Sequence, residues 1–171
     1  MLQQLSLVSF LHLAKDASRV AIYREIAADR LTPIGIVERL PEEMKEGMIL
    51  ESGLNSPEVG RYSFITFGSI AQLKVQNNTV LQQIGKEQTT LTISPFAALR
   101  QLLKKLACAS EHQDVNFMNG AVGFMTYDAV RLFESIPDRH TDDDALPEML
   151  FHFYQTTLVF DHLKQNLTTT D

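Results

Sequence analysis

Apolar and polar residues alternate with a period of two along several short segments of the chain, which predicts β-strands. The alternation separates Tyr62 and Phe64 from Ser63, Ile65 and Phe67 on the two faces of one such strand. Asn77 and Asn78 lie between two alternating segments and predict a tight hairpin turn, because Asn tolerates positive φ. The predicted strands are 19–26, 48–52, 60–68, 70–76, 79–84, 89–93, 120–125, 149–161 and 167–171.

Two segments carry a strong helix-start signal, in which a hydroxyl residue is followed directly by proline. Thr32 precedes Pro33, and Ser94 precedes Pro95. The hydroxyl caps free backbone N–H groups, and proline loses nothing at the first helical position. Weaker patterns predict a helix over 5–15 and another after the strand at 120–125, while 109–116 is expected to be a surface loop. Few helices among many antiparallel strands predict an α+β domain, with helices packed on a mainly antiparallel sheet.

Composition and charge exclude several classes of function. The chain has 171 residues, a net charge of −6 and one cysteine. This length suits one domain, and the acidic balance argues against nucleic acid or an anionic membrane as partner. No secretory signal or membrane-spanning run is evident, so a cytoplasmic location is expected. Cys108 is expected to be a small buried apolar side chain and not a nucleophile.

The end of the strand at 48–52 is the most informative position for chemistry. Leu50 is followed there by Glu51 and Ser52. A carboxylate at the end of an apolar strand needs water, a cation or several donors. Glu51 therefore faces water, pairs with Arg61, or binds the ammonium group of a ligand.

Other polar motifs favour structural roles. Gly120 and Gly123 do not have the spacing of a phosphate-binding loop and indicate close backbone packing. Asp128 and Arg131 predict a structural ion pair on a helix. The acidic run 142–144 does not have the alternating ligands of a calcium loop, and no metal site is predicted.

Three stretches together resemble the N-terminal domain of anthranilate synthase component I. They are Leu50-Glu51-Ser52 with Gly60-Arg61-Tyr62-Ser63-Phe64-Ile65, the Tyr23-Arg24-Glu25-Ile26 segment with Thr32-Pro33, and the segment 117–134. Asn119 departs from the pattern, since the family usually has glycine there.

The resemblance implies a function and a domain organisation. Residues 1–171 would be a single regulatory domain of a longer subunit, and the chorismate-binding catalytic region, which uses Mg²⁺, would be absent. The chain alone should then hold no catalytic residue, bind no cofactor and convert no chorismate. The implied ligand is L-tryptophan, as a feedback inhibitor. The residues expected to bind it are Leu50, Glu51, Ser52, Tyr62 and Phe64.

Partners and alternatives follow from the same resemblance. The implied partner of the full enzyme is a glutamine amidotransferase subunit, and an exposed sheet edge near 149–171 predicts self-association into homo-oligomers. The alternatives are the related aminodeoxychorismate synthase component I of folate synthesis, a free-standing amino-acid-binding module, and a structural domain with an empty site. Leu50-Glu51-Ser52 favours the tryptophan branch.

Overall fold

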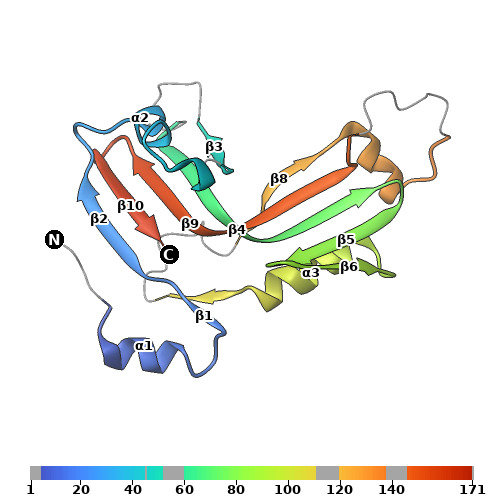
Figure 1. Ribbon diagram of the computed structural model, residues 1–171, viewed down its shortest axis with the longest axis horizontal. Helices are drawn as coiled ribbons and strands as arrows, with labels where there is room; N and C mark the ends of the chain where they lie inside the picture. The colour runs from blue at the N-terminus through green and yellow to red at the C-terminus, as the bar shows by residue number, and fades with distance from the viewer. Residues whose placement is uncertain (1–4, 45, 52–59, 111–119, 138–145, 171) are drawn as a thin grey trace. The chain divides into compact units, whose positions relative to one another are not determined.

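The computed structural model describes residues 5–44, 46–51, 60–110, 120–137 and 146–170 of the chain. These residues form two compact units. Unit 1 consists of Met1–Ser69, Leu106–Asn119 and Tyr154–Asp171, and unit 2 of Ile70–Lys105 and Gly120–Phe153. The two longest strands, β4 (Tyr62–Gln76) and β9 (Met149–Asp161), pair with each other and each contributes one part to each unit (Figure 1).

Unit 1 is built on an antiparallel sheet. Its strand order is β2 (Tyr23–Ala27), β10 (Asn166–Thr170), β9, β4 and β3 (Met48–Leu50). The expectation of an exposed sheet edge near 149–171 was wrong, because β9 and β10 each pair with a strand on both sides. The short helix α2 (Pro33–Val37) lies over this sheet, and η1 (Glu42–Met44) follows it (Figure 1). Outside this sheet are α1 (Leu7–Leu13) and the two-residue parallel pair of β1 (Arg19–Val20) with β7 (Cys108–Ala109).

The core of unit 1 lies on the face of the sheet that α2 covers. It consists of buried Ala28, Ile65, Leu158, Phe160 and Leu167. Ile36 and Val37 of α2 pack against this cluster, as do Ile49 and Phe67. The alternation predicted for the strand that contains Ile65 is therefore confirmed, because Ile65 and Phe67 both reach the apolar core.

Unit 2 is a second antiparallel assembly. The meander of β4, β5 (Thr79–Ile84) and β6 (Glu87–Leu91) continues into α3 (Pro95–Lys105), which contacts β5. β8 (Val122–Met125) pairs with β9, and the 3₁₀ helix η2 (Tyr127–Leu132) follows it. Buried residues of this unit include Leu73, Val75, Leu102, Met149 and Phe153.

The local signals read from the sequence correspond to observed contacts. The Thr32 hydroxyl accepts a hydrogen bond from the Gly35 N–H at 3.0 Å, and the Ser94 hydroxyl accepts one from the Ala97 N–H at 3.3 Å. Asn77 and Asn78 have φ of 51° and 59° and form the predicted hairpin turn. The α+β class, with a mainly antiparallel sheet and few helices, is confirmed.

Several element boundaries differ from the sequence-based expectation, and four of these differences are informative. The predicted strands 60–68 and 70–76 are one strand, because Gly68 adopts φ of 70° and the chain passes through this position without ending the strand. The segment 19–26 is two strands, β1 and β2. β6 begins at Glu87, directly after the turn, instead of at 89. Ala109 belongs to β7 instead of a loop, because it pairs with Val20, a partner far away in the sequence.

Gly123 is placed where two strands come very close. A Cβ atom built on Gly123 would lie 1.9 Å from the carbonyl oxygen of Leu150 on β9. Any side chain would force β8 and β9 apart, which confirms the packing role predicted for this glycine.

Candidate ligand-binding site

Three of the five residues expected to bind the ligand lie together on unit 1. Leu50 on β3 is directly opposite Phe64 on β4 in the antiparallel register, so their side chains share a face of the sheet. The rings of Tyr62 and Phe64 have centroids 6.2 Å apart. Leu50 and Tyr62 are each 41% exposed, and Phe64 is half-buried. These side chains form an apolar wall that solvent reaches.

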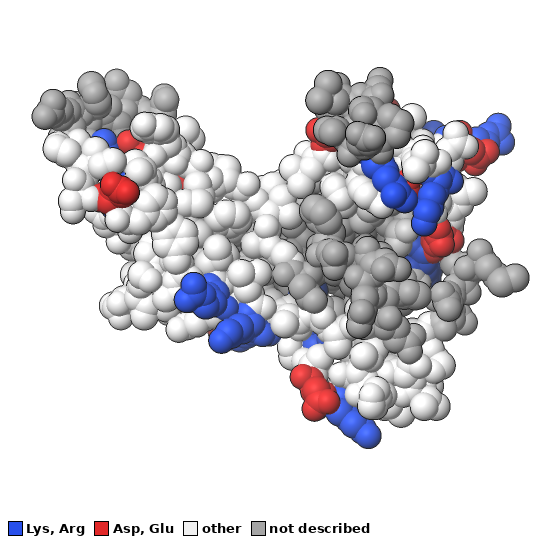
Figure 2. All heavy atoms as spheres, turned by 180° about the vertical axis from the view of Figure 1, so that it is seen from behind, with Lys and Arg blue, Asp and Glu red and all other residues white. Residues whose placement is uncertain are grey.

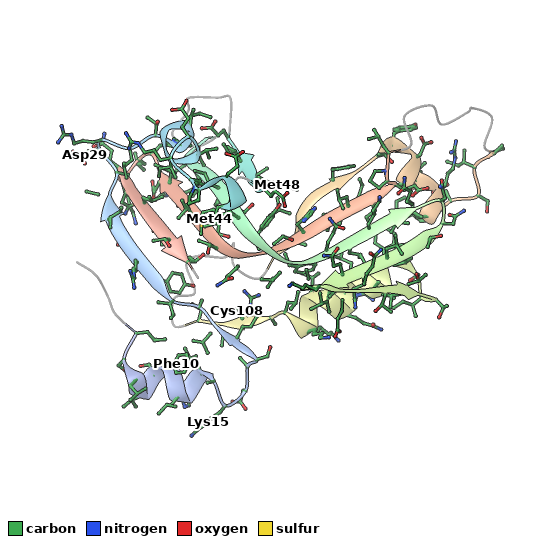
Figure 3. The ribbon with its side chains drawn as sticks, viewed as in Figure 1. Phe10, Lys15, Asp29, Met44, Met48 and Cys108 are labelled. Atoms are coloured by element: carbon green, nitrogen blue, oxygen red, sulfur yellow. The ribbon has the colours of Figure 1, made fainter. Side chains whose placement is uncertain are left out.

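Glu51 follows β3 directly and is exposed. The carboxylate therefore follows directly after the strand that carries Leu50, the one wall residue on β3. Ser52 lies outside the described residues. Met48, labelled in Figure 3, is the first residue of β3.

Arg61 has a different partner from the one considered in the sequence. Its guanidinium forms an ion pair with Asp161, with 2.6 Å between Nη2 and Oδ2 and two further contacts from Nε at 3.1 Å. The ion pair between Glu51 and Arg61, one of the three environments considered for Glu51, was therefore a wrong expectation. Asp161 is 100 positions away from Arg61 along the chain, so no local pattern pointed to it.

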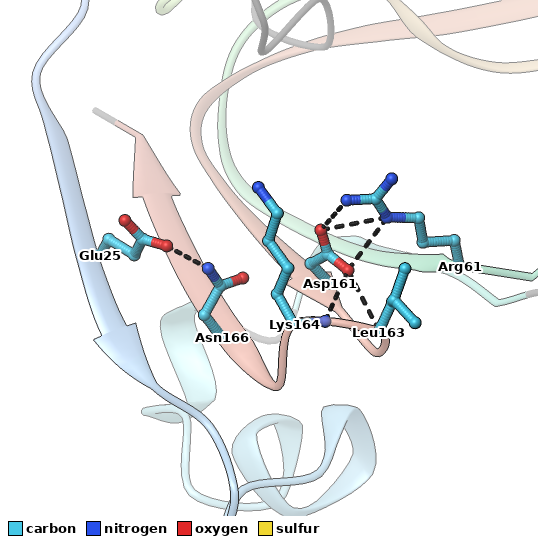
Figure 4. A network of polar contacts seen from close by, with 6 residues as sticks. All are labelled: Glu25, Arg61, Asp161, Leu163, Lys164 and Asn166. Carbon is cyan, nitrogen blue, oxygen red and sulfur yellow. Dashed lines mark hydrogen bonds and ion pairs between the residues drawn. The ribbon is translucent and has the colours of Figure 1, made fainter. Parts of the chain in front are cut away.

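Asp161 is buried and its carboxylate accepts hydrogen bonds from two directions (Figure 4). Besides Arg61, the backbone N–H groups of Leu163 and Lys164 donate to Oδ1 at 3.1 Å each. Burial alone would raise the pKa of Asp161, but the bond from Arg61 and these backbone bonds outweigh it and lower the pKa below its ordinary value of 3.8. The hydrogen bond to Asp161 in turn raises the pKa of Arg61.

A second polar contact lies beside this pair. The hydroxyl of buried Ser63 and Nε2 of His162 are 2.7 Å apart, and the His162 N–H donates to the carbonyl of Arg61 at 2.9 Å. The His162 ring stacks on Phe160. These contacts fix the first residues of β4 against the hairpin that joins β9 to β10.

The remaining polar groups singled out in the sequence have structural surroundings. Asp128 and Arg131 form the predicted ion pair at 3.1 Å. Cys108 lies on β7 (Figure 3), where burial raises the pKa of its thiol and nearby Arg19 lowers it only in part. A raised thiol pKa disfavours the thiolate nucleophile, as expected for a packing residue.

Charge and hydropathy add two observations about the described part of the chain. Its basic and acidic side chains occur in several small groups separated by uncharged residues on the face seen in Figure 2. No helix in the described ranges is both long and apolar enough to cross a membrane. The acidic run 142–144 lies outside the described residues.

The chain belongs to the chorismate binding enzyme family, which matches residues 49–171. This region begins within β3 and includes β4 and the wall formed by Leu50, Tyr62 and Phe64.

Several similar proteins are named anthranilate synthase component 1. Anthranilate synthase component 1 of Acetivibrio thermocellus is 31% identical over 156 residues, which cover 91% of this chain and 31% of the relative. The probable anthranilate synthase component 1 of Schizosaccharomyces pombe is 33% identical over 152 residues, covering 88% of this chain and 28% of the relative.

A solved structure agrees with these relatives. Anthranilate synthase component I from Streptococcus pneumoniae TIGR4 has a TM-score of 0.54 and 26% identity, and the match covers 83% of this chain and 30% of that one. The resemblance indicated by the sequence motifs is therefore confirmed. The chain spans 31% of the length of the Acetivibrio relative.

Proposed function

We propose that this chain is the N-terminal regulatory domain of an anthranilate synthase component I, and that it binds L-tryptophan as a feedback inhibitor. The observation that carries the proposal is the antiparallel register that sets Leu50 opposite Phe64, with Tyr62 beside them and Glu51 next in the chain. An indole ring needs an apolar wall, and the ligand ammonium needs an anion. Leu50, Tyr62 and Phe64 would supply the wall and Glu51 the anion, with Ser52 as a further donor or acceptor.

The longer subunit would make anthranilate from chorismate, together with a glutamine amidotransferase partner. A cytoplasmic location and inactivity of this chain alone toward chorismate belong to the same proposal. The support is the similarity to anthranilate synthase component 1 over more than 80% of this chain in each relative compared above.

Mg²⁺ is implied for the longer enzyme by the family resemblance. The described residues contain no group of three or more His, Cys, Asp or Glu side chains that could hold a metal ion. We therefore assign the ion no residue of this chain.

Tryptophan binding can be measured directly because the chain contains no tryptophan of its own. The fluorescence of the added ligand is therefore free of indole emission from the protein. We expect saturable binding of L-tryptophan and weaker binding by Glu51→Gln, a variant that removes the charge and keeps the shape. A hydrogen bond to a charged group contributes about 1.5–3 kcal/mol, and because Glu51 is exposed the lower end applies, which is about tenfold in affinity.

Glu46→Gln is the matched control. Glu46 is also an exposed acid, but it precedes β3, whereas Glu51 follows it. It should bind tryptophan like the wild type. Absence of saturable binding by the wild type, or equal affinity of the two variants, would overturn the proposal. In the longer subunit, Glu51→Gln should also relieve inhibition by tryptophan, because effector and substrate are linked by one coupling free energy.

A further inference from the structure

The guanidinium of Arg61 lies over the ring of Tyr62, with 4.9 Å between Cζ and the ring centroid. A planar cation at this distance from an aromatic face is attracted by the ring's negative charge distribution. Tyr62 is 41% exposed, so burial alone leaves its ring considerable freedom. The contact with Arg61 restricts that freedom from one side, and the ring of Phe64 restricts it from another.

Arg61 is itself held in place by a rigid partner. Its Nε and Nη2 donate to the carboxylate of Asp161, which fixes both the position and the plane of the guanidinium. The carboxylate cannot turn freely, because the N–H groups of Leu163 and Lys164 also donate to Oδ1 (Figure 4).

The main chain of Arg61 is fixed as well, since its carbonyl accepts the N–H of His162 at 2.9 Å. The turn between β9 and β10 therefore determines where the guanidinium lies, and through it where the ring of Tyr62 lies. These contacts connect the turn after Asp161, through Arg61, to Tyr62 in the apolar wall, and all of these residues lie in unit 1.

We propose that Arg61, oriented by Asp161, is a positioning residue that sets the ring of Tyr62 for ligand binding. This inference rests on the proposed tryptophan site and extends it to two residues that do not belong to the apolar wall. It implies that the turn after β9 influences affinity although none of its residues needs to touch the ligand.

The test uses Asp161→Asn in the full chain. An asparagine oxygen can still accept the N–H groups of Leu163 and Lys164, so the turn keeps its cap while the ion pair with Arg61 is lost. Asp128→Asn is the control, because it removes an ion pair in unit 2 that does not involve Arg61 or Tyr62. Both variants change one aspartate to asparagine and remove one negative charge.

Two readouts are needed. The first is the NMR signal of the Tyr62 ring in protein labelled at its four tyrosines, assigned with Tyr62→Phe. We expect this signal to shift in Asp161→Asn and to stay unchanged in Asp128→Asn. The second is tryptophan affinity, which should fall about threefold to tenfold in Asp161→Asn only, a loss on the scale of one cation–π contact.

The outcomes separate the two proposals. Wild-type protein that fails to bind tryptophan overturns the proposed function. Wild-type protein that binds, with Asp161→Asn and Asp128→Asn alike in both readouts, overturns the positioning role and leaves the proposed function standing. A shift of the Tyr62 signal without loss of affinity also overturns it, since the ring would then be oriented without serving the ligand.

Discussion

Ile65 is the residue at which the core of unit 1 can be tested most directly. It is 2% exposed and packs with Ala28, Leu158, Phe160 and Leu167. Replacing it with alanine removes three buried carbon atoms, which at about 0.8 kcal/mol each amounts to about 2.4 kcal/mol of lost transfer free energy. The neighbours belong largely to hydrogen-bonded strands and can close the void only in part, so a cavity term raises the expected loss to about 3–4 kcal/mol.

The measurement is urea or thermal unfolding of Ile65→Ala, followed by circular dichroism. In a chain of this size the loss corresponds to a fall in Tm of roughly 6–16 °C. Ile34→Ala is the control, because Ile34 on α2 is 52% exposed and its truncation should cost less than about 1 kcal/mol. A loss below about 1.5 kcal/mol for Ile65→Ala, or equal losses for the two variants, would refute the assignment of Ile65 to the centre of this core.

Two further predictions concern a close strand contact and the response to pH. Gly123→Ala should lower the unfolding midpoint clearly, because its Cβ would lie 1.9 Å from the Leu150 oxygen. Gly85→Ala is the control, since its Cβ would meet nothing within 4 Å and only its φ of 56° disfavours alanine. Equal losses in the two variants would contradict the close-packing argument. Because the folded pKa of Asp161 lies below 3.8, the stability that this carboxylate contributes is present above pH 3.8 and is lost as pH falls below it through the folded pKa. The difference in unfolding midpoint between the wild type and Asp161→Asn should therefore be largest near neutral pH and shrink in acid, and a difference that stays constant would show that the charge of Asp161 does not matter.

The sequence predicts those parts of the fold that depend on neighbouring residues. The caps at Thr32 and Ser94 and the turn at Asn77 and Asn78 follow from side-chain chemistry within a few positions, and each was found where expected. The strand through Gly68 was divided in the prediction because glycine commonly marks a break. Here glycine adopts a left-handed φ that other residues rarely reach, and the strand continues through it.

The candidate site was predictable only in part for the same reason. Leu50, Tyr62 and Phe64 come together through the local geometry of two adjacent strands, which alternation and a short connection already suggest. The partner of Arg61 could not be found this way, because Asp161 is brought to it by the pairing of β4 with β9. The signal available in the sequence was an aspartate at the end of a long apolar strand just before a turn, a position where carboxylates often cap backbone N–H groups.

The alternation along β4 also separates the effects of substitutions at neighbouring positions. Ile65 points to the core, while Phe64 and Tyr62 contact each other on the opposite face. Truncation of Ile65 should therefore act mainly on the free energy of unfolding, and truncation of Tyr62 mainly on the proposed binding of tryptophan. A one-residue change in the register of β4 would turn each of its side chains to the opposite face of the sheet. The apolar core and the apolar wall would then be lost together. Asp161 and Arg61 hold the start of this strand against the β9–β10 turn.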